Sequence, residues 1–261
     1  RLIDGDGDPS VATVTITLAP DSTPTVLVAQ GSDTQVDEAA LPVGSNPTSN
    51  GEFASGALVI TTGNDTVGTL TVNGQNVTNG GTVTTALGIL TVTGSPSSGY
   101  TYSYQLTAVT SDGAGPETDT FAITVTDSDG DPASTSLVID IVDDVPTARN
   151  DSATQSPENA SITVNVVAND TFGADGVNLA TGVELVAGSL AVSPGQAPGT
   201  LADNGDGTFT YVPSAGQEGT VTFQYRLIDG DGDPSVATVT ITLAPDSTPT
   251  VLVAQGSDTS V

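Results

Sequence analysis

The amino-acid sequence predicts an all-β protein built of tandem immunoglobulin-like β-sandwiches in an elongated array. Composition is the first reason, since 30 Gly and 16 Pro punctuate a chain of 261 residues in which only 4% are aromatic. The second is the alternation of apolar and polar residues over short segments, as in Phe121-Ala-Ile-Thr-Val-Thr126, which is typical of half-buried strands. About seven such strands per domain, separated by turns, fit a sandwich of this class.

An acidic hexapeptide that recurs between alternating segments is the third reason. Asp-Gly-Asp-Gly-Asp-Pro stands at residues 4–9 and again at 229–234, and a close relative, Asp-Ser-Asp-Gly-Asp-Pro, stands at 127–132. Because alternating apolar residues flank each copy, each is predicted to be a loop that joins two strands.

A long internal repeat predicts the domain organisation. Residues 1–34 recur without a change as residues 226–259, which indicates tandem duplication and a segment taken from a longer array. A weaker echo between residues 121–132 and 223–234 indicates that two related domain types alternate. We expect the last hairpin of a preceding module at 1–19, a linker at 20–24, one sandwich at 25–142, a linker at 143–146, a second sandwich at 147–244, a linker at 245–249 and the start of another module at 250–261.

The alternation also places the strands. In the first sandwich they are expected at 58–61, 69–72, 87–93, 100–107, 121–126 and 137–142, and in the second at 162–167, 185–192, 208–212, 221–228 and 236–243. Tyr100, Tyr102 and Tyr104 share one strand face with Leu106 and are assigned to the core instead of a ligand platform. Asn204-Gly-Asp-Gly207 is a hairpin turn signal.

The charge excludes several classes of partner. A net charge of −28 arises from 31 acidic residues against Arg1, Arg149 and Arg226, with no Lys and no His, so no basic face for nucleic acid can form.

No apolar run is long enough for a membrane span and no signal peptide is visible, so no membrane insertion is expected in this segment. Cysteine is absent, which removes disulfides and thiolate metal sites.

The acidic loops are candidate calcium sites. Three carboxylates at alternate positions repel one another unless a cation lies among them, and hard oxygen ligands favour Ca²⁺. The alternative is that Asp, Gly and Pro are simply good turn formers. The EF-hand pattern does not fit, because Pro234 and Thr240 stand where it needs Gly and Glu. The candidate ligands are Asp4, Asp6 and Asp8, then Asp127, Asp129 and Asp131, then Asp229, Asp231 and Asp233.

Acidic residues at the expected junctions are candidates for further ligands. We expect a cation to bridge the acidic loop of one domain, the linker and the head of the next domain, which would stiffen the joint. The linker candidates are Asp21, Asp143, Asp144 and Asp246, and the candidates at the start of a module are Asp37, Glu38, Asp151 and Glu158.

Catalysis is not expected, and neither is a small-molecule substrate. Without His, Cys or Lys, the usual nucleophile and base pairs cannot be assembled. Paired carboxylates could in principle cleave glycosides, but such sites need an acid in an apolar pocket and usually an aromatic-lined groove. The few aromatic residues lie on expected core faces.

Three stretches of the first domain and the following linker resemble the repeated modules of giant, type I-secreted RTX adhesins of bacteria. They are residues 71–93, 118–131 and 143–148. The second domain is similar to the cadherin-like, immunoglobulin-like repeats of the same proteins, through Asn150-Asp151, Glu158, Val166-Val-Ala-Asn-Asp170 and Asn204–Pro213. The resemblance covers nearly the whole chain. It implies Ca²⁺ at the module joints, carried onto the acidic-loop residues at 127, 129 and 131 and at 229, 231 and 233.

The same resemblance implies an extender. Such a segment holds adhesive domains away from a Gram-negative cell surface, for attachment and biofilm formation, with neighbouring copies of its own modules as partners. Calcium outside the cell would bind only the folded modules and stiffen the array. Two alternatives stay open: a module whose loops bind a glycan or a surface, and calcium-dependent homotypic adhesion between arrays.

Overall fold

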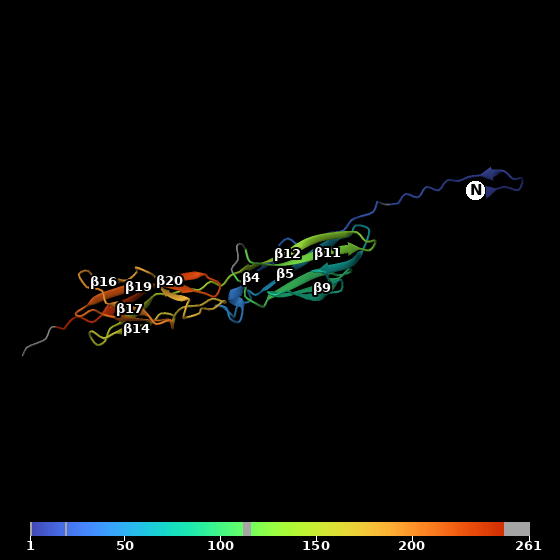
Figure 1. The fold of residues 1–261 in the computed structure, drawn as a ribbon. Coiled ribbons are helices and arrows are strands. Elements are labelled where there is room, and N and C mark those ends of the chain that lie inside the picture. The colour runs from blue at the N-terminus through green and yellow to red at the C-terminus, as the bar shows by residue number, and fades with distance from the viewer. Residues whose placement is uncertain (1, 19, 112–115, 248–261) are drawn as a thin grey trace, which may run out of the picture.

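Two β-sandwiches follow one another along the chain in the computed structural model, which describes residues 2–18, 20–111 and 116–247 (Figure 1). Sandwich 1 has two five-stranded sheets, with strand orders β3-β5-β10-β9-β8 and β4-β12-β11-β6-β7. Its elements are β3 (Thr25–Val28), β4 (Gln35–Asp37), the 3-10 helix η1 (Glu38–Ala40), β5 (Phe53–Thr61), β6 (Val67–Val72), β7 (Gln75–Asn76), β8 (Gly81–Thr84), β9 (Gly88–Ser95), β10 (Gly99–Leu106), β11 (Thr118–Asp127) and β12 (Pro132–Val142).

Sandwich 2 has a sheet of order β13-β20-β19-β15, in which β16 also pairs with β19, and a second sheet of order β14-β18-β17. Its strands are β13 (Asp151–Thr154), β14 (Ile162–Asn165), β15 (Val183–Leu185), β16 (Ala191–Val192), β17 (Thr200–Asp203), β18 (Thr208–Val212), β19 (Gly219–Ile228) and β20 (Pro234–Leu243). The fold is all-β, as the sequence predicts.

Alternate residues of the long strands form the two cores. Tyr100, Tyr102 and Tyr104 on β10 are buried together with Leu106, which confirms their assignment to the core. Tyr104 packs edge-on against Phe121 of the opposite sheet, with ring centroids 5.8 Å apart. In sandwich 2 the corresponding role falls to Phe209 and Phe223, whose ring centroids are 5.3 Å apart. Such pairs add stabilisation beyond the burial of their area.

Most expected strands are present, often with longer bounds. One expectation is wrong: the segment 185–192 is not a single strand, because β15 and β16 are separated by a turn at Gly188, whose φ is +76°. Short strands without clear alternation, such as β4 and β13, are missing from the expectation. The hairpin turn at residues 204–207 is confirmed, since β17 and β18 pair as an antiparallel hairpin across it.

The strand directions give each sandwich two different ends. β12 begins directly after the acidic loop at 127–131 and ends at the linker at 143–146, so the loop and this linker lie at opposite ends of sandwich 1. β20 has the same relation to the loop at 229–233. We call the end with the acidic loop the leading end and the other the trailing end. In Figure 1 the trailing end of sandwich 1, near β4, faces sandwich 2.

The N-terminal segment shows that burial depends on the partner sheet. β1 (Leu2–Ile3) pairs with β2 (Pro9–Ser10), and the residues that follow, including Val14 and Ile16, are exposed. The identical sequence forms β20 in sandwich 2, where Val239 and Ile241 are fully buried. The same alternation therefore becomes a core strand only where a second sheet covers it.

No helix among the described residues is long and apolar enough to cross a membrane.

Two phenylalanines of sandwich 1 offer a matched test of its core. Replacing the buried Phe121 by Ala removes a fully enclosed ring, so we expect a loss of about 3–5 kcal/mol in the unfolding free energy of sandwich 1. Phe53 is 45% exposed, and Phe53→Ala should cost about 1 kcal/mol or less. Denaturant unfolding followed by circular dichroism measures both, and equal losses would contradict the core described above.

Candidate metal centre

The first Asp of each acidic loop uses one carboxylate oxygen to bend the loop. Asp127 Oδ1 accepts the backbone N–H of Gly130 at 3.1 Å and that of Asp131 at 2.8 Å. In the second loop Asp229 Oδ1 accepts the N–H of Gly232 at 3.0 Å and that of Asp233 at 2.7 Å. The glycines that close the two loops have positive φ, +115° and +125°, a conformation that costs glycine little.

The other carboxylate oxygen of the first Asp in each loop has no hydrogen-bond partner. Asp127 is 3% exposed and Asp229 is 7% exposed, and the Oδ2 atom of each is buried without a hydrogen-bond partner. A turn-forming role accounts for Oδ1 only. Leaving a buried carboxylate oxygen unpaired costs free energy, so these two atoms are candidates for contact with a positive ligand.

Two glutamates at the trailing end of sandwich 1 share one donor residue. Glu38, in η1, is fully buried, and its Oε1 accepts the backbone N–H of Thr110 at 2.5 Å and the Thr110 hydroxyl at 2.8 Å. The same hydroxyl also contacts Glu117 Oε2. One hydroxyl hydrogen serves one acceptor, so the pair of glutamates has too few donors.

Acidic residues from three parts of the chain meet these glutamates. Ligand oxygens of Glu38, Asp143 and Asp175 lie within 4.8 Å of one another, and they come from sandwich 1, the linker and sandwich 2. The acidic loop of sandwich 2 completes the group, since its carboxylates interact with Asp143 and Asp175. We call this group the joint cluster: Glu38, Glu117, Asp143, Asp175, Asp229, Asp231 and Asp233.

Burial leaves the joint cluster short of hydrogen-bond donors. Five of its carboxylate oxygens are buried and unpaired: Glu38 Oε2, Glu117 Oε1, Asp143 Oδ1, Asp175 Oδ2 and Asp229 Oδ2. The sequence has no basic residue between Arg1 and Arg149, so sandwich 1 and the linker supply no balancing side chain.

The same crowding raises several pKa values. Burial, followed by contact with the Asp233 carboxylate, raises the pKa of Asp143 to about 8. Burial, followed by the charge of Asp231, raises the pKa of Asp175 to about 6. Burial also raises the pKa of Glu38 and that of Asp229. Burial and mutual repulsion thus disfavour the ionised forms of these carboxylates in the ion-free protein.

The linker itself is fixed by Asp144. Asp144 Oδ2 accepts the backbone N–H of Ser45 at 2.7 Å, and its Oδ1 accepts the Ser45 hydroxyl at 2.5 Å. On the other side, a Cβ on Gly173, whose φ is +74°, would lie 1.9 Å from the Asp144 carbonyl oxygen. The linker is therefore tethered to sandwich 1 and packed closely on sandwich 2. Both oxygens of Asp144 are occupied, so it positions the joint.

The chemistry of the joint cluster fits calcium. All its side-chain donors are carboxylate oxygens, several bring a free oxygen, and calcium takes six to eight such ligands in flexible geometry. Zinc prefers nitrogen and sulfur ligands, and the sequence has neither His nor Cys. The positive charge would pair oxygens that the protein leaves unpaired.

The arrangement at the joint differs from the expected one. The acidic loop at 229–233 lies with the linker that precedes its own sandwich and with the trailing end of the previous sandwich. Glu38 was expected near the linker at 20–24, but β4 runs parallel to β12 and carries Glu38 to the far end, beside Asp143. Asp37 caps η1, because its Oδ1 accepts the N–H of Ala39 at 2.8 Å.

Asp151 does not lie at a joint. It pairs in register with Val239 in the middle of β20, near Asp170 and the hydroxyl of Tyr225. Burial, followed by the charge of Asp170, raises its pKa to about 6. Tyr225 donates toward Asp170, whose oxygens lie 2.8 and 3.0 Å away.

The remaining candidates lie at the outer ends. Glu158 and Asp246 meet at the trailing end of sandwich 2, where Glu158 Oε2 accepts the Ser247 hydroxyl at 2.5 Å and Glu218 Oε2 accepts the N–H of Asp246 at 3.1 Å. Asp21 lies with Asp129 and Asp131 at the leading end of sandwich 1. Asp4, Asp6 and Asp8 also form a group, in the exposed N-terminal hairpin.

Sequence reasoning missed Glu117, Asp175, Asp65 and Glu218. Glu117 and Glu218 each directly precede a long strand, β11 or β19, but their spacing to Phe121 and Phe223 differs by one residue, so the internal repeat does not align them. Asp65 and Asp175 lie in irregular loops and reach the acidic loops only through the tertiary fold.

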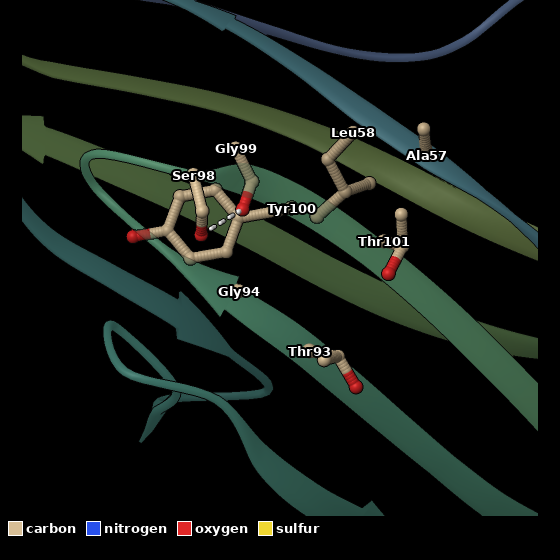
Figure 2. Close-up of a pocket in the computed structure, with 8 residues that line it drawn as sticks. All are labelled: Ala57, Leu58, Thr93, Gly94, Ser98, Gly99, Tyr100 and Thr101. Carbon is tan, nitrogen blue, oxygen red and sulfur yellow. Dashed lines mark hydrogen bonds between the residues drawn. The ribbon is translucent and has the colours of Figure 1, made fainter.

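A shallow hollow on sandwich 1 offers no comparable chemistry. Figure 2 shows Leu58, Thr93, Ser98 and Tyr100 around it, with the Ser98 hydroxyl donating to the Gly99 carbonyl oxygen at 3.3 Å. No charged side chain lines it, and its one aromatic residue, Tyr100, is a core residue.

Comparison with known proteins supports the fold. The family model described as a bacterial Ig domain matches residues 143–242, which include most of sandwich 2. No curated protein matches the chain.

The similar solved structures have low sequence identity to this chain. They include protocadherin gamma B7 extracellular cadherin domains 1–4 (12% identity, TM-score 0.30, 86% of this chain and 51% of that one). The D00-D0 domain of intimin has 14% identity and a TM-score of 0.30, and the match covers 84% of this chain and 99% of that one. Human protocadherin-24 EC1-2 has 15% identity and a TM-score of 0.31, and the match covers 86% of this chain and 100% of that one. The chain thus spans about half the length of the first of these. Nothing about function follows from likeness at this level.

The raised pKa of Asp143 predicts how pH affects the ion-free protein. Because the folded state holds this proton up to about pH 8 and the unfolded state loses it near pH 4, the folded state binds more protons between these values. Stability therefore falls as pH rises through this window. In chelator, Asp143→Asn should gain stability relative to the unmodified chain, by more than about 1 kcal/mol between pH 5.5 and pH 8.5.

Urea unfolding at the two pH values measures this difference. Glu184→Gln, at an exposed position on β15, removes a charge without touching the joint cluster and should show no such change. If the difference in unfolding free energy between Asp143→Asn and the unmodified chain were the same at both pH values, the placement of Asp143 among buried carboxylates would be contradicted.

Proposed function

We propose that this segment is a calcium-stiffened spacer of a bacterial cell-surface adhesin. It would act as an extender of tandem sandwiches that projects adhesive domains from a Gram-negative cell, after secretion by a type I route as in the RTX adhesins that its sequence resembles. The proposal includes no catalytic step. Attachment and biofilm formation would depend on the reach of the array.

The observation that carries the proposal is the set of five buried, unpaired carboxylate oxygens between the two sandwiches. They come from both sandwiches and the linker, so a cation bound among them would connect all three parts. Without the cation, ionised carboxylates repel one another across the joint and favour its opening. Calcium binding would thus be coupled to the relative placement of the two sandwiches.

A spacer accounts for the surface better than a binding module does. The hollow on sandwich 1 has no charged group and no exposed aromatic ring to stack on a sugar. The unchanged recurrence of residues 1–34 as 226–259 also supports a part selected for repetition, since binding loops would be expected to vary between copies.

Distance measurements between the sandwiches test the stiffening. The sequence has no Cys, so Ser103→Cys on β10 and Gln224→Cys on β19, both exposed, place one spin label on each sandwich. With millimolar calcium we expect the distance distribution from double electron-electron resonance to narrow at least about twofold relative to chelator, because bound calcium then offsets the repulsion within the joint cluster.

Matched variants locate the effect. In the labelled chain, Asp175→Asn should leave the distribution broad in calcium, whereas Glu184→Gln, which also removes one negative charge from sandwich 2, should narrow like the parent. A distribution that calcium does not change would overturn the stiffened spacer.

Calcium should also raise the melting temperature of the chain. A ligand that binds only the folded state at 100 times its Kd stabilises it by about 2.7 kcal/mol, which corresponds to an increase on the order of 10 °C for a domain of this size. Differential scanning calorimetry with and without calcium measures the shift. Magnesium at the same concentration should give a smaller shift, because it demands smaller, stricter octahedral geometry; equal shifts would indicate simple charge screening.

A further inference from the structure

The leading end of sandwich 1 holds two overlapping groups of carboxylates. Ligand oxygens of Asp21, Asp129 and Asp131 lie within 4.8 Å of one another, and so do those of Asp65, Asp127 and Asp129. Asp129 belongs to both groups. We call the five residues the leading cluster.

A buried oxygen points to a ligand at this cluster, independently of the number of acids. Asp127 is 97% enclosed, and its Oδ2 has no hydrogen-bond partner while its Oδ1 holds the loop. The Asp129 carboxylate lies between the Asp127 carboxylate and that of Asp21, and these contacts raise its pKa to about 7. A side chain with a neighbour on each side is placed to serve two ions.

Charge balance favours two divalent cations. Five ionised carboxylates carry about five negative charges, and the sequence has no basic residue between Arg1 and Arg149 to offset them. One calcium ion leaves most of this charge uncompensated, whereas two nearly neutralise it. A carboxylate can bridge two ions because its two oxygens can each bind one, at the separation of about 3.5–4 Å known for paired metals.

All five residues belong to sandwich 1 and its preceding linker. The linker is already docked there, since the Ser22 hydroxyl lies 3.0 Å from the Thr62 carbonyl oxygen and 2.9 Å from Asp65 Oδ2. These contacts place Asp21 beside the acidic loop without help from another module. The joint cluster differs, because it needs residues from two sandwiches.

We infer that the leading cluster binds a pair of calcium ions bridged by the Asp129 carboxylate, and that sandwich 1 with its own linker is sufficient to hold the pair. The inference rests on the proposed function in one respect, namely that the acidic clusters bind calcium. Its consequence is a division of labour: the bridged pair fixes the linker on sandwich 1, whether or not the joint cluster is filled.

Counting bound ions tests the inference. Native mass spectrometry of the full chain with calcium gives the number of ions per chain, and differences between variants remove the contribution of other sites. Asp21→Asn and Asp65→Asn should each lose one ion, because each touches one of the two groups. Asp129→Asn should lose two, because it belongs to both.

Controls separate this inference from the proposed function. Glu184→Gln should keep the full number of ions, and Asp175→Asn should lose ions at the joint cluster only. If Asp129→Asn lost one ion or none while Asp175→Asn lost its own, the bridged pair would be wrong and the joint site would stand. If the unmodified chain bound no calcium, both would be wrong.

Folding of the key variant is checked in chelator. Asp129 is exposed and only its contacts with other carboxylates would change, so Asp129→Asn should melt at the same temperature as the unmodified chain, or higher, at pH 8. A lower melting temperature together with a loss of two ions would indicate a structural role and overturn the assignment of Asp129 as a bridge.

Discussion

Repulsion among carboxylates that the fold brings together is the constraint on which the joint depends. In most proteins such groups are paired with Lys or Arg, but this chain has three basic residues against 31 acids. Hydrogen-bond donors in the chain stabilise only some of the carboxylate oxygens. Thr110 donates to Glu38 and contacts Glu117, and backbone N–H groups serve one oxygen of Asp229, yet the other oxygens of all three acids stay unpaired. The fold therefore holds these carboxylates together without supplying the counter-charge that would balance them.

Strand topology decides which acids meet. β4 and β13 are the first strands to join the long hairpins β11-β12 and β19-β20, and both do so in parallel. A parallel strand carries the residues that follow it toward the end where the hairpin's second strand also stops. Glu38 and Glu158 thus reach trailing ends, although the sequence places them near the start of their sandwiches. The acidic loop, at the other end of the same hairpin, must then meet the previous module.

These relations explain what the sequence could and could not predict. The alternation of apolar and polar residues on β10, β11, β19 and β20 is long and regular. Core residues such as Tyr104 and Phe223 were therefore predictable from this two-residue repeat alone. The acidic loops between these strands were also predictable, because their sequence repeats, whereas their role as ligands stays a prediction. Glu38 was found as a residue but placed at the wrong end, since three-residue strands such as β4 give no period from which to infer direction. Asp65 and Asp175 had no local signal, because irregular loops bring them to the loops at 127–131 and 229–233.

The two ends of a sandwich are unlike, and this difference favours head-to-tail contacts over a two-fold dimer. Leading ends carry an acidic loop with a linker Asp, as at Asp21 and Asp143. Trailing ends carry glutamates in similar positions, Glu38 and Glu117 in sandwich 1 and Glu158 and Glu218 in sandwich 2. Contacts between unlike surfaces repeat head to tail and do not close a two-fold dimer. Each added module would again place its trailing end against the leading end of the next module. The length of such an array is then set by the number of repeats in the chain.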